Sequence, residues 1–134
     1  MKQCSLLIVN STGSESPFKD ALEQRGFRVT ELNEWPADDV VLDPQVVVFV
    51  LRHLETVGML AARMRAKPRF GRRILIALVP TLTAADRRTA IGAGFDDMIG
   101  ESGGARLLIA RILRLLRMRP EHRCFLPDLK GRAA

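Results

Sequence analysis

The sequence predicts an α/β domain built on a doubly wound, five-stranded parallel sheet of the (β/α)5 kind. Short apolar runs alternate with longer amphipathic segments along the chain, and the runs at 6–9 and 46–51 are apolar at every position. A continuous apolar run is typical of a strand covered on both faces, and the run at 46–51 is predicted to be central. At 134 residues the chain suits one domain with one core.

The predicted elements follow a regular strand–helix order. Ser16 before Pro17 favours a helix start, because a capping residue precedes a proline suited to the first turn, and Gly26 ends that helix. Thr83 with Asp86 three residues later favours another helix start. The segment 33–44 is interrupted by prolines and has room only for a shortened second helix. The predicted strands are 6–9, 27–32, 46–51, 74–79 and 97–100, and the longer helices are 16–26, 54–66, 83–94 and 105–117.

The domain is expected to span residues 1–118, with 119–134 as a C-terminal tail. No apolar run approaches the roughly 18 residues of a membrane span, and the first residues lack the pattern of a signal peptide. We therefore expect a cytoplasmic protein without a membrane partner. Cys4 and Cys124 lie near opposite ends of the chain without the spacing of a metal site, so we expect free thiols.

The chain is basic, with a net charge of +6 and a pI near 10.3. Such a charge suits an acidic partner, whether nucleic acid, a membrane surface or an acidic protein face. Arginine outnumbers lysine 17 to 4 and is scattered as singles and pairs, so compositional bias is the alternative explanation.

Ligands of a doubly wound sheet bind beyond the carboxyl ends of its strands, here the loops at 10–14, 52–55, 79–83 and 100–104. The loop from Asn10 to Ser14 has neither a GxGxxG nor a P-loop pattern. We expect no nucleophile elbow, and neither His53 nor His122 has an identifiable Ser or Cys partner. The sequence thus predicts no cofactor, no metal and no enzymatic activity.

Two stretches carry a family resemblance. The helix end Ala21-Leu-Glu-Gln-Arg-Gly-Phe27 and the stretch Ala93-Gly-Phe-Asp-Asp-Met-Ile99, with Pro44 opening the central strand, resemble the receiver domain of bacterial two-component response regulators. The second stretch is similar to that family's Gly-Ala-Asp-Asp-Tyr-Leu. The resemblance covers residues 4–118 and implies a flavodoxin-like fold with a second helix shorter than usual.

In that family, a working receiver transfers a phosphoryl group to an Asp at the end of the third strand. It uses a divalent metal on an acidic pair after the first strand, a Ser or Thr after the fourth and a Lys after the fifth, which neutralise the transferring charge. By the resemblance these positions fall on Asn10, Ser11, Val50, Val79 and Glu101, and all have changed. A valine cannot be phosphorylated, and Asn10 with Ser11 offers a hard cation too little charge. The resemblance therefore implies a degenerate pseudo-receiver.

Arg52 follows the former acceptor position closely, and Glu101 has the charge that suits it. One hypothesis is that an Arg52–Glu101 pair spans the pocket and holds it in one state. The alternative is two independent surface charges that contribute little.

The last predicted helix has a wide apolar arc and a basic opposite side. Receivers commonly meet partners through the fourth helix, fifth strand and fifth helix, so this face is the candidate protein interface, with a small apolar centre and an arginine rim. The alternative is a solvated basic face. The candidate interface residues are Arg87, Arg88, Met98, Arg106, Leu107, Arg111, Arg114 and Arg117.

The function expected from these features is a phosphorylation-independent signalling adaptor that binds a protein partner, with a homodimer through the last helix as one arrangement. A basic nucleic-acid-binding or regulatory domain of a transcriptional regulator is the second interpretation, since arginines could contact phosphates. A small flavodoxin-like enzyme is the third, and it lacks a polar constellation at the strand ends.

Overall fold

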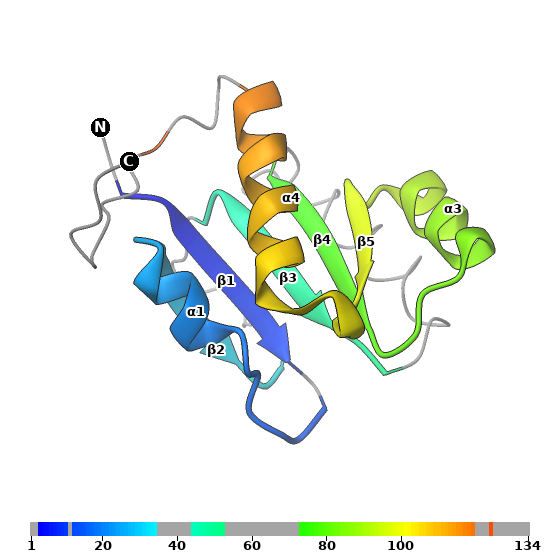
Figure 1. Ribbon diagram of the computed structural model, residues 1–134, viewed down its shortest axis with the longest axis horizontal. Coiled ribbons are helices and arrows are strands. Elements are labelled where there is room, and N and C mark those ends of the chain that lie inside the picture. Colours follow the sequence, from blue (N-terminus) through cyan, green and yellow to red (C-terminus); the bar gives the residue numbers. More distant parts are fainter. Residues whose placement is uncertain (1–2, 11, 35–43, 53–72, 120–123, 125–134) are drawn as a thin grey trace.

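The computed structural model contains one five-stranded parallel sheet with the order β2-β1-β3-β4-β5 (Figure 1). The structure describes residues 3–10, 12–34, 44–52, 73–119 and 124. This order is the flavodoxin-like form of a doubly wound sheet, and it confirms the predicted fold class. The strands are β1 (Ser5–Asn10), β2 (Arg28–Leu32), β3 (Val46–Val50), β4 (Ile74–Val79) and β5 (Asp97–Gly100).

The central position of β3 follows from its apolar sequence. Every residue of β3 and of its neighbour β4 is buried, whereas no residue of the edge strand β2 is fully buried. A strand that is covered on both faces cannot place a polar side chain without leaving it unsatisfied, so its sequence is continuously apolar. The predicted strand at 46–51 is therefore confirmed as the centre of the sheet.

Helices cover both faces of the sheet. Because successive side chains of a strand point to opposite faces, the strands contribute to two separate hydrophobic clusters. Core cluster 1 joins Ile8 and Val48 to Leu22 of α1 (Lys19–Gln24) and Ile112 of α4 (Gly104–Met118). Core cluster 2, on the other face, receives Ala90 of α3 (Ala84–Ala93). In Figure 1, α1 and α4 lie across the same face, and α3 lies beyond the β5 edge.

The helix ends follow the predicted signals with one difference. The Thr83 hydroxyl accepts a hydrogen bond from the Asp86 N–H at 3.1 Å, and Gly94 ends α3 with a φ of 116°, a left-handed conformation that favours glycine. Helix α1 begins at Lys19, later than predicted, because the Ser16 hydroxyl accepts the Phe18 N–H at 3.2 Å and forms a turn before the helix.

A short 3-10 helix, η2 (Glu101–Gly103), connects β5 to α4. The predicted helix at 54–66 and most of the predicted short helix within 33–44 lie outside the described residues. Among the helices in the described ranges, none has the length and apolar character that crossing a membrane requires.

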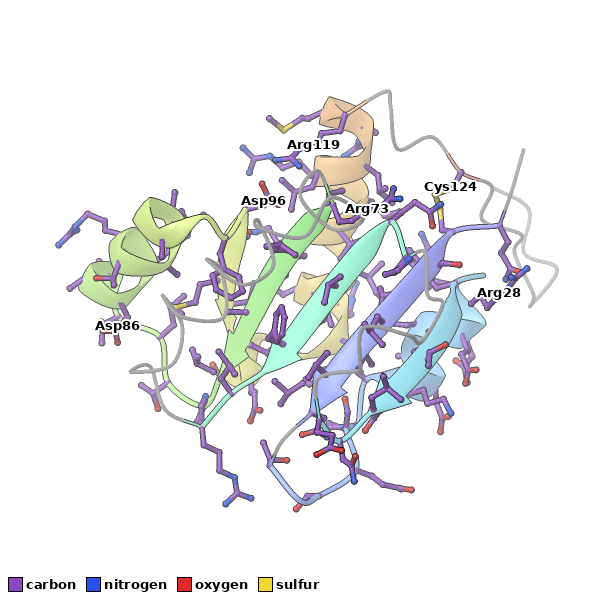
Figure 2. The ribbon with its side chains drawn as sticks, turned by 180° about the vertical axis from the view of Figure 1, so that it is seen from behind. Arg28, Arg73, Asp86, Asp96, Arg119 and Cys124 are labelled. Carbon is purple, nitrogen blue, oxygen red and sulfur yellow. A yellow bond between two sulfur atoms is a disulfide. The ribbon has the colours of Figure 1, made fainter. Side chains whose placement is uncertain are left out.

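The two cysteines form a disulfide, Cys4–Cys124, with a Cα–Cα distance of 4.9 Å (Figure 2). The expectation of two free thiols was wrong in this structure. It rested on a separation of 120 residues along the chain, but the amino end of β1 and the segment after α4 meet in space. Chain distance alone carries no information on such long-range contacts.

Candidate functional site

The register of the sheet brings the predicted pocket positions to one edge. Asn10, the last residue of β1, pairs with Val50, the last residue of β3. Val79 ends β4 beside the end of β5, and Glu101 follows that strand directly. These four positions therefore gather at the carboxyl edge of the sheet, while Ser11, the fifth, lies outside the described residues. We call this edge the strand-end pocket.

Asn10 has its polar atoms fully occupied by neighbouring protein groups. Its side-chain nitrogen donates to the Ser14 carbonyl at 2.6 Å and to Glu31 Oε2 at 3.2 Å. Its side-chain oxygen accepts from the Thr12 N–H at 3.1 Å and from the Thr12 hydroxyl at 2.6 Å. Asn10 is only 4% exposed, so these bonds satisfy a buried amide and shape the loop after β1.

Glu31 is a member of this pocket that the sequence analysis missed. It belongs to β2, pairs with Ile8 of β1, and its carboxylate accepts both the Asn10 amide and the Ser16 N–H, the latter at 3.2 Å. The sequence contained a signal for this position. Glu31 lies near the carboxyl end of a strand predicted to run parallel to the first, and that is the end at which the pocket was expected. Glu31 thus adds a carboxylate from β2 to the pocket, and that carboxylate accepts hydrogen bonds from within the protein.

The former acceptor position is apolar and inaccessible. Val50 is 4% exposed and Val79 is 1% exposed. Neither side chain has an oxygen that could accept a phosphoryl group or donate to one. Within the described part of the chain, no three His, Cys, Asp or Glu side chains come together as metal ligands. The arrangement organises a loop and closes the edge of the core.

The turn after β5 contains a GxSxG sequence at residues 100–104, which the sequence analysis did not recognise. In hydrolases with this pattern the serine occupies a strained strand-to-helix turn that presents its hydroxyl. Ser102 instead lies in η2, and no non-glycine residue in the described ranges has a positive φ. The sequence pattern therefore occurs here without the backbone conformation of a nucleophile elbow.

The hypothesis of an Arg52–Glu101 ion pair was wrong for this structure. Arg52 is exposed after β3, and none of the ion pairs between described residues joins it to Glu101. The sheet order explains this result, because β4 separates β3 from β5 and places their ends two strand spacings, about 10 Å, apart. The two charges are independent.

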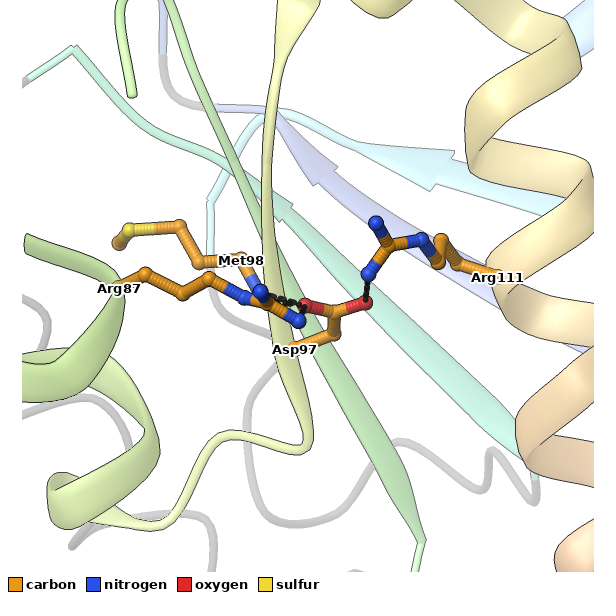
Figure 3. A network of polar contacts seen from close by, with 4 residues as sticks. All are labelled: Arg87, Asp97, Met98 and Arg111. Carbon is orange, nitrogen blue, oxygen red and sulfur yellow. Dashed lines mark hydrogen bonds and ion pairs between the residues drawn. The ribbon is translucent and has the colours of Figure 1, made fainter. Parts of the chain in front are cut away.

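The strongest polar cluster lies instead on β5, around the buried carboxylate of Asp97 (Figure 3). Asp97 Oδ1 accepts from Arg87 Nε of α3 at 3.2 Å and from the Met98 N–H at 2.8 Å, and Oδ2 accepts from Arg111 of α4 at 2.9 Å. The Asp97 side chain is 5% exposed, against 43% for Arg87 and 30% for Arg111. One buried anion thus joins α3, β5 and α4.

The neighbouring Asp96 forms a second polar link. Its Oδ2 accepts the Leu75 N–H at 2.7 Å at the start of β4, and its Oδ1 forms an ion pair with Arg119, just after α4. Figure 2 shows Asp96 and Arg119 beside one another at this end of the molecule. The Asp-Asp stretch that carried the family resemblance therefore connects β5 to the start of β4 and to both flanking helices.

Several response regulators have solved structures similar to this one. The chain resembles a response regulator from Desulfuromonas acetoxidans with a TM-score of 0.66 and 23% identity, over 86% of this chain and 98% of that one. It resembles a response regulator from Thermotoga maritima with a TM-score of 0.68 and 19% identity, over the same shares. The receiver domain of a Francisella response regulator is similar with a TM-score of 0.64 and 16% identity, over 86% of this chain and 98% of that one. The chain has the receiver fold.

No family model matches the sequence, and no curated protein does. The receiver fold is therefore visible in the three-dimensional arrangement and in short stretches of sequence. The sheet order and the Asp-Asp stretch carry the likeness, whereas the strand-end pocket differs from the residues that the family resemblance implies.

On the receiver fold, the predicted interface loses its apolar centre. Met98 is 1% exposed and belongs to core cluster 2, so its prediction as a surface residue was wrong. Leu107 is half-buried and packs against core cluster 1. Arg87 and Arg111 are engaged by Asp97, so they hold the face together rather than forming a free rim. A four-residue strand is too short to show a clear alternation of apolar and polar residues. The sequence therefore did not reveal that the Met98 side chain points into the core.

Four of the predicted arginines are exposed: Arg88, Arg106, Arg114 and Arg117. The last three belong to α4, where spacings of eight and three residues place them on one face, and we call them the basic stripe. The exposed large apolar side chains of the described residues are Leu82, just before α3, Ile91 in α3 and Met118 at the end of α4. A shallow hollow along α3 is lined by Leu82, Thr83, Ala84, Arg87, Arg88 and Ile91.

Proposed function

We propose that this chain is a receiver-fold signalling module that binds a protein partner and is not phosphorylated at its strand-end pocket. The observation that carries the proposal is the closed state of that pocket. Asn10 occupies a position that the family resemblance assigns to a cation ligand. Both the nitrogen and the oxygen of its side-chain amide form hydrogen bonds with other groups of the protein. Val50 occupies the acceptor position as a buried hydrocarbon.

Phosphoryl transfer requires positive charge at the transferring group and an oxygen that can attack it. The described part of the strand-end pocket offers a neutral amide, two valines and the carboxylates of Glu31 and Glu101. Added negative charge from a phosphoryl group would be repelled by these carboxylates. The module is therefore proposed to bind and not to catalyse.

The first test exposes the protein to a small phosphodonor. After incubation with acetyl phosphate and Mg²⁺, intact-mass measurement is expected to show the unmodified chain. A phosphorylation-competent receiver in the same buffer is the positive control. A stable or hydroxylamine-sensitive phosphoryl adduct on this chain, located to the strand-end pocket by peptide mapping, would contradict the proposal.

The basic stripe on α4 is the proposed partner surface. Arg106, Arg114 and Arg117 are exposed, and within the described residues no ion pair involves them. By contrast, Arg87, Arg111 and Arg119 are bound to aspartates of β5 or its preceding turn. Unpaired arginines on a rigid helix suit an acidic protein surface, because such charges accelerate and orient association.

The second test reverses two charges of the stripe. An Arg114→Glu, Arg117→Glu variant is expected to lose a specific partner in pull-downs from the native host, with binding weakened at least about tenfold. The variant should retain the wild-type melting temperature within about 2 °C, since exposed substitutions usually change stability by about 0.5 kcal/mol or less.

The matched control is Arg28→Glu, Arg52→Glu, which makes the same change in net charge at two exposed arginines away from α4. If the control loses the partner equally, net charge and not the stripe is responsible. Binding of arbitrary duplex DNA with a steep salt dependence, abolished only in the α4 variant, would favour the nucleic-acid interpretation instead.

A further inference from the structure

The Cys4–Cys124 disulfide connects the start of the sheet with the chain beyond the last helix, and its two ends are held very differently. Cys4 is fully buried in core cluster 1. Its carbonyl accepts the Arg28 N–H at 2.8 Å, and the side chain of the preceding Gln3 donates to the Gly26 carbonyl at 2.6 Å. The Cys4 end is therefore fixed within the β1–β2 edge of the sheet.

Cys124 has fewer attachments. It is half-buried at the margin of core cluster 1, and it is the one described residue after Arg119. No backbone hydrogen bond between described residues holds Cys124. Because Cys124 is half-buried and Cys4 is fully buried, we expect a reductant to reach the Cys124 sulfur first.

We propose that the Cys4–Cys124 disulfide is a redox-controlled tether that fixes the chain beyond α4 to the amino end of β1. The proposal is independent of the function proposed for the strand-end pocket. Its basis is that a covalent link joins Cys4, a fully buried residue of the core, to Cys124, a half-buried residue at the margin of the same core. In a reducing compartment, which the sequence predicts, disulfides are usually transient or redox-sensing.

The opening reaction is thiol–disulfide exchange with a dithiol reductant. A reductant thiolate attacks the accessible Cys124 sulfur, the S–S bond breaks, and Cys4 leaves as a thiolate that takes up a proton. The second reductant thiolate then attacks the mixed disulfide and releases Cys124 as a thiolate, which is also protonated. Two electrons pass to the protein, giving two cysteine thiols and one reductant disulfide.

Opening the tether is expected to lower the melting temperature. The disulfide closes a loop of 120 residues, nearly the whole chain. Chain-entropy estimates for so long a loop, with the size scaling of unfolding entropy, correspond to a decrease of about 15–20 °C. The measurement compares air-oxidised and dithiothreitol-treated protein by circular dichroism. Iodoacetamide mass shifts on the same samples count the free thiols.

Cys124→Ser is the first variant, because its side chain is half-buried and a hydroxyl is tolerated there. Its melting temperature should equal that of reduced wild type and should no longer change on addition of dithiothreitol. Cys4→Ala, the second variant, keeps an apolar atom at the buried position and should behave in the same way. Trypsin should cleave after residue 123 faster in reduced than in oxidised wild type, while cleavage within the sheet stays slow.

Three results would overturn the proposal. The first is alkylation of both cysteines in the folded, air-oxidised protein, which means that the bond does not form. The second is an equal melting temperature and equal cleavage after residue 123 in both redox states, which means that the bond fixes nothing. The third is a bond that resists a large excess of reduced glutathione over many hours in the folded protein, which makes it a permanent cross-link.

Discussion

Replacing Asp97 with alanine is expected to lower the free energy of unfolding by about 3 kcal/mol. The carboxylate is buried and receives hydrogen bonds from Arg87, Arg111 and the Met98 N–H. Because β5 is at the end of the sheet order, the Met98 N–H depends on this carboxylate. The two arginines are partly exposed and can be solvated once the carboxylate is gone. The decrease in the free energy of unfolding therefore stays below that for breaking a fully buried ion pair. Urea denaturation measures it.

Asp97→Asn is the conservative comparison, since the amide oxygen can still accept one hydrogen bond, and about half of the loss is expected. Asp86→Ala is the matched control, because Asp86 lies in the first turn of α3 and contributes at most about 1 kcal/mol through the helix dipole. Equal effects of Asp97→Ala and Asp86→Ala would contradict the role given to the β5 carboxylate. Asp97→Ala should also loosen α3 and α4 against β5, detectable as faster amide exchange in both helices.

Asn10→Asp is expected to destabilise the protein by about 2–3 kcal/mol in the absence of divalent cations. The substitution replaces the amide donor that lies 3.2 Å from Glu31 Oε2 with a second carboxylate. At an effective dielectric constant near 20, two like charges at this distance repel by several kcal/mol, and partial movement toward water relieves some of it. Two adjacent carboxylates also suit a hard cation, so millimolar Mg²⁺ should recover about half of the loss.

Two further variants separate repulsion from lost hydrogen bonds. Asn10→Ala removes the amide without adding charge, and a smaller loss of about 1–2 kcal/mol without any response to Mg²⁺ is expected. Asn10→Asp combined with Glu31→Gln restores an uncharged neighbour and should recover most of the stability in EDTA. An Asn10→Asp protein as stable as wild type in EDTA would show that Glu31 and residue 10 are not neighbours.

The arrangement of the sheet could be predicted because it depends on a repeated signal. Continuous apolar runs identified β1 and β3 as buried strands, and the positions that the resemblance assigned to the pocket, Asn10, Val50, Val79 and Glu101, do lie at one edge of the parallel sheet. Cap residues also predicted the ends of α3 correctly, since the Thr83 hydroxyl and Gly94 each act on backbone groups within a few residues of themselves. These features are local, or they follow from topology alone.

The remaining features depend on pairwise contacts between distant residues. Arg87 and Arg111 have nothing in their spacing that assigns both to Asp97, and a four-residue strand is too short for its pattern to reveal that every residue in it is buried. The same holds for Cys4 and Cys124, which meet only because the amino end of β1 and the chain after α4 lie together. The arginine composition was visible in the sequence; which arginines are paired was not.

The hydrogen bonds of Asn10 close the strand-end pocket of this receiver fold. Nuclear magnetic resonance on ¹⁵N-labelled wild type, titrated with Mg²⁺ and then with beryllium fluoride, a phosphoryl mimic, tests this closure most directly. We expect the Asn10 side-chain amide to be protected from exchange, and the backbone signals of Asn10, Val50 and Glu101 to keep their positions. Saturable shifts at these three residues, with loss of Asn10 amide protection, would contradict the account.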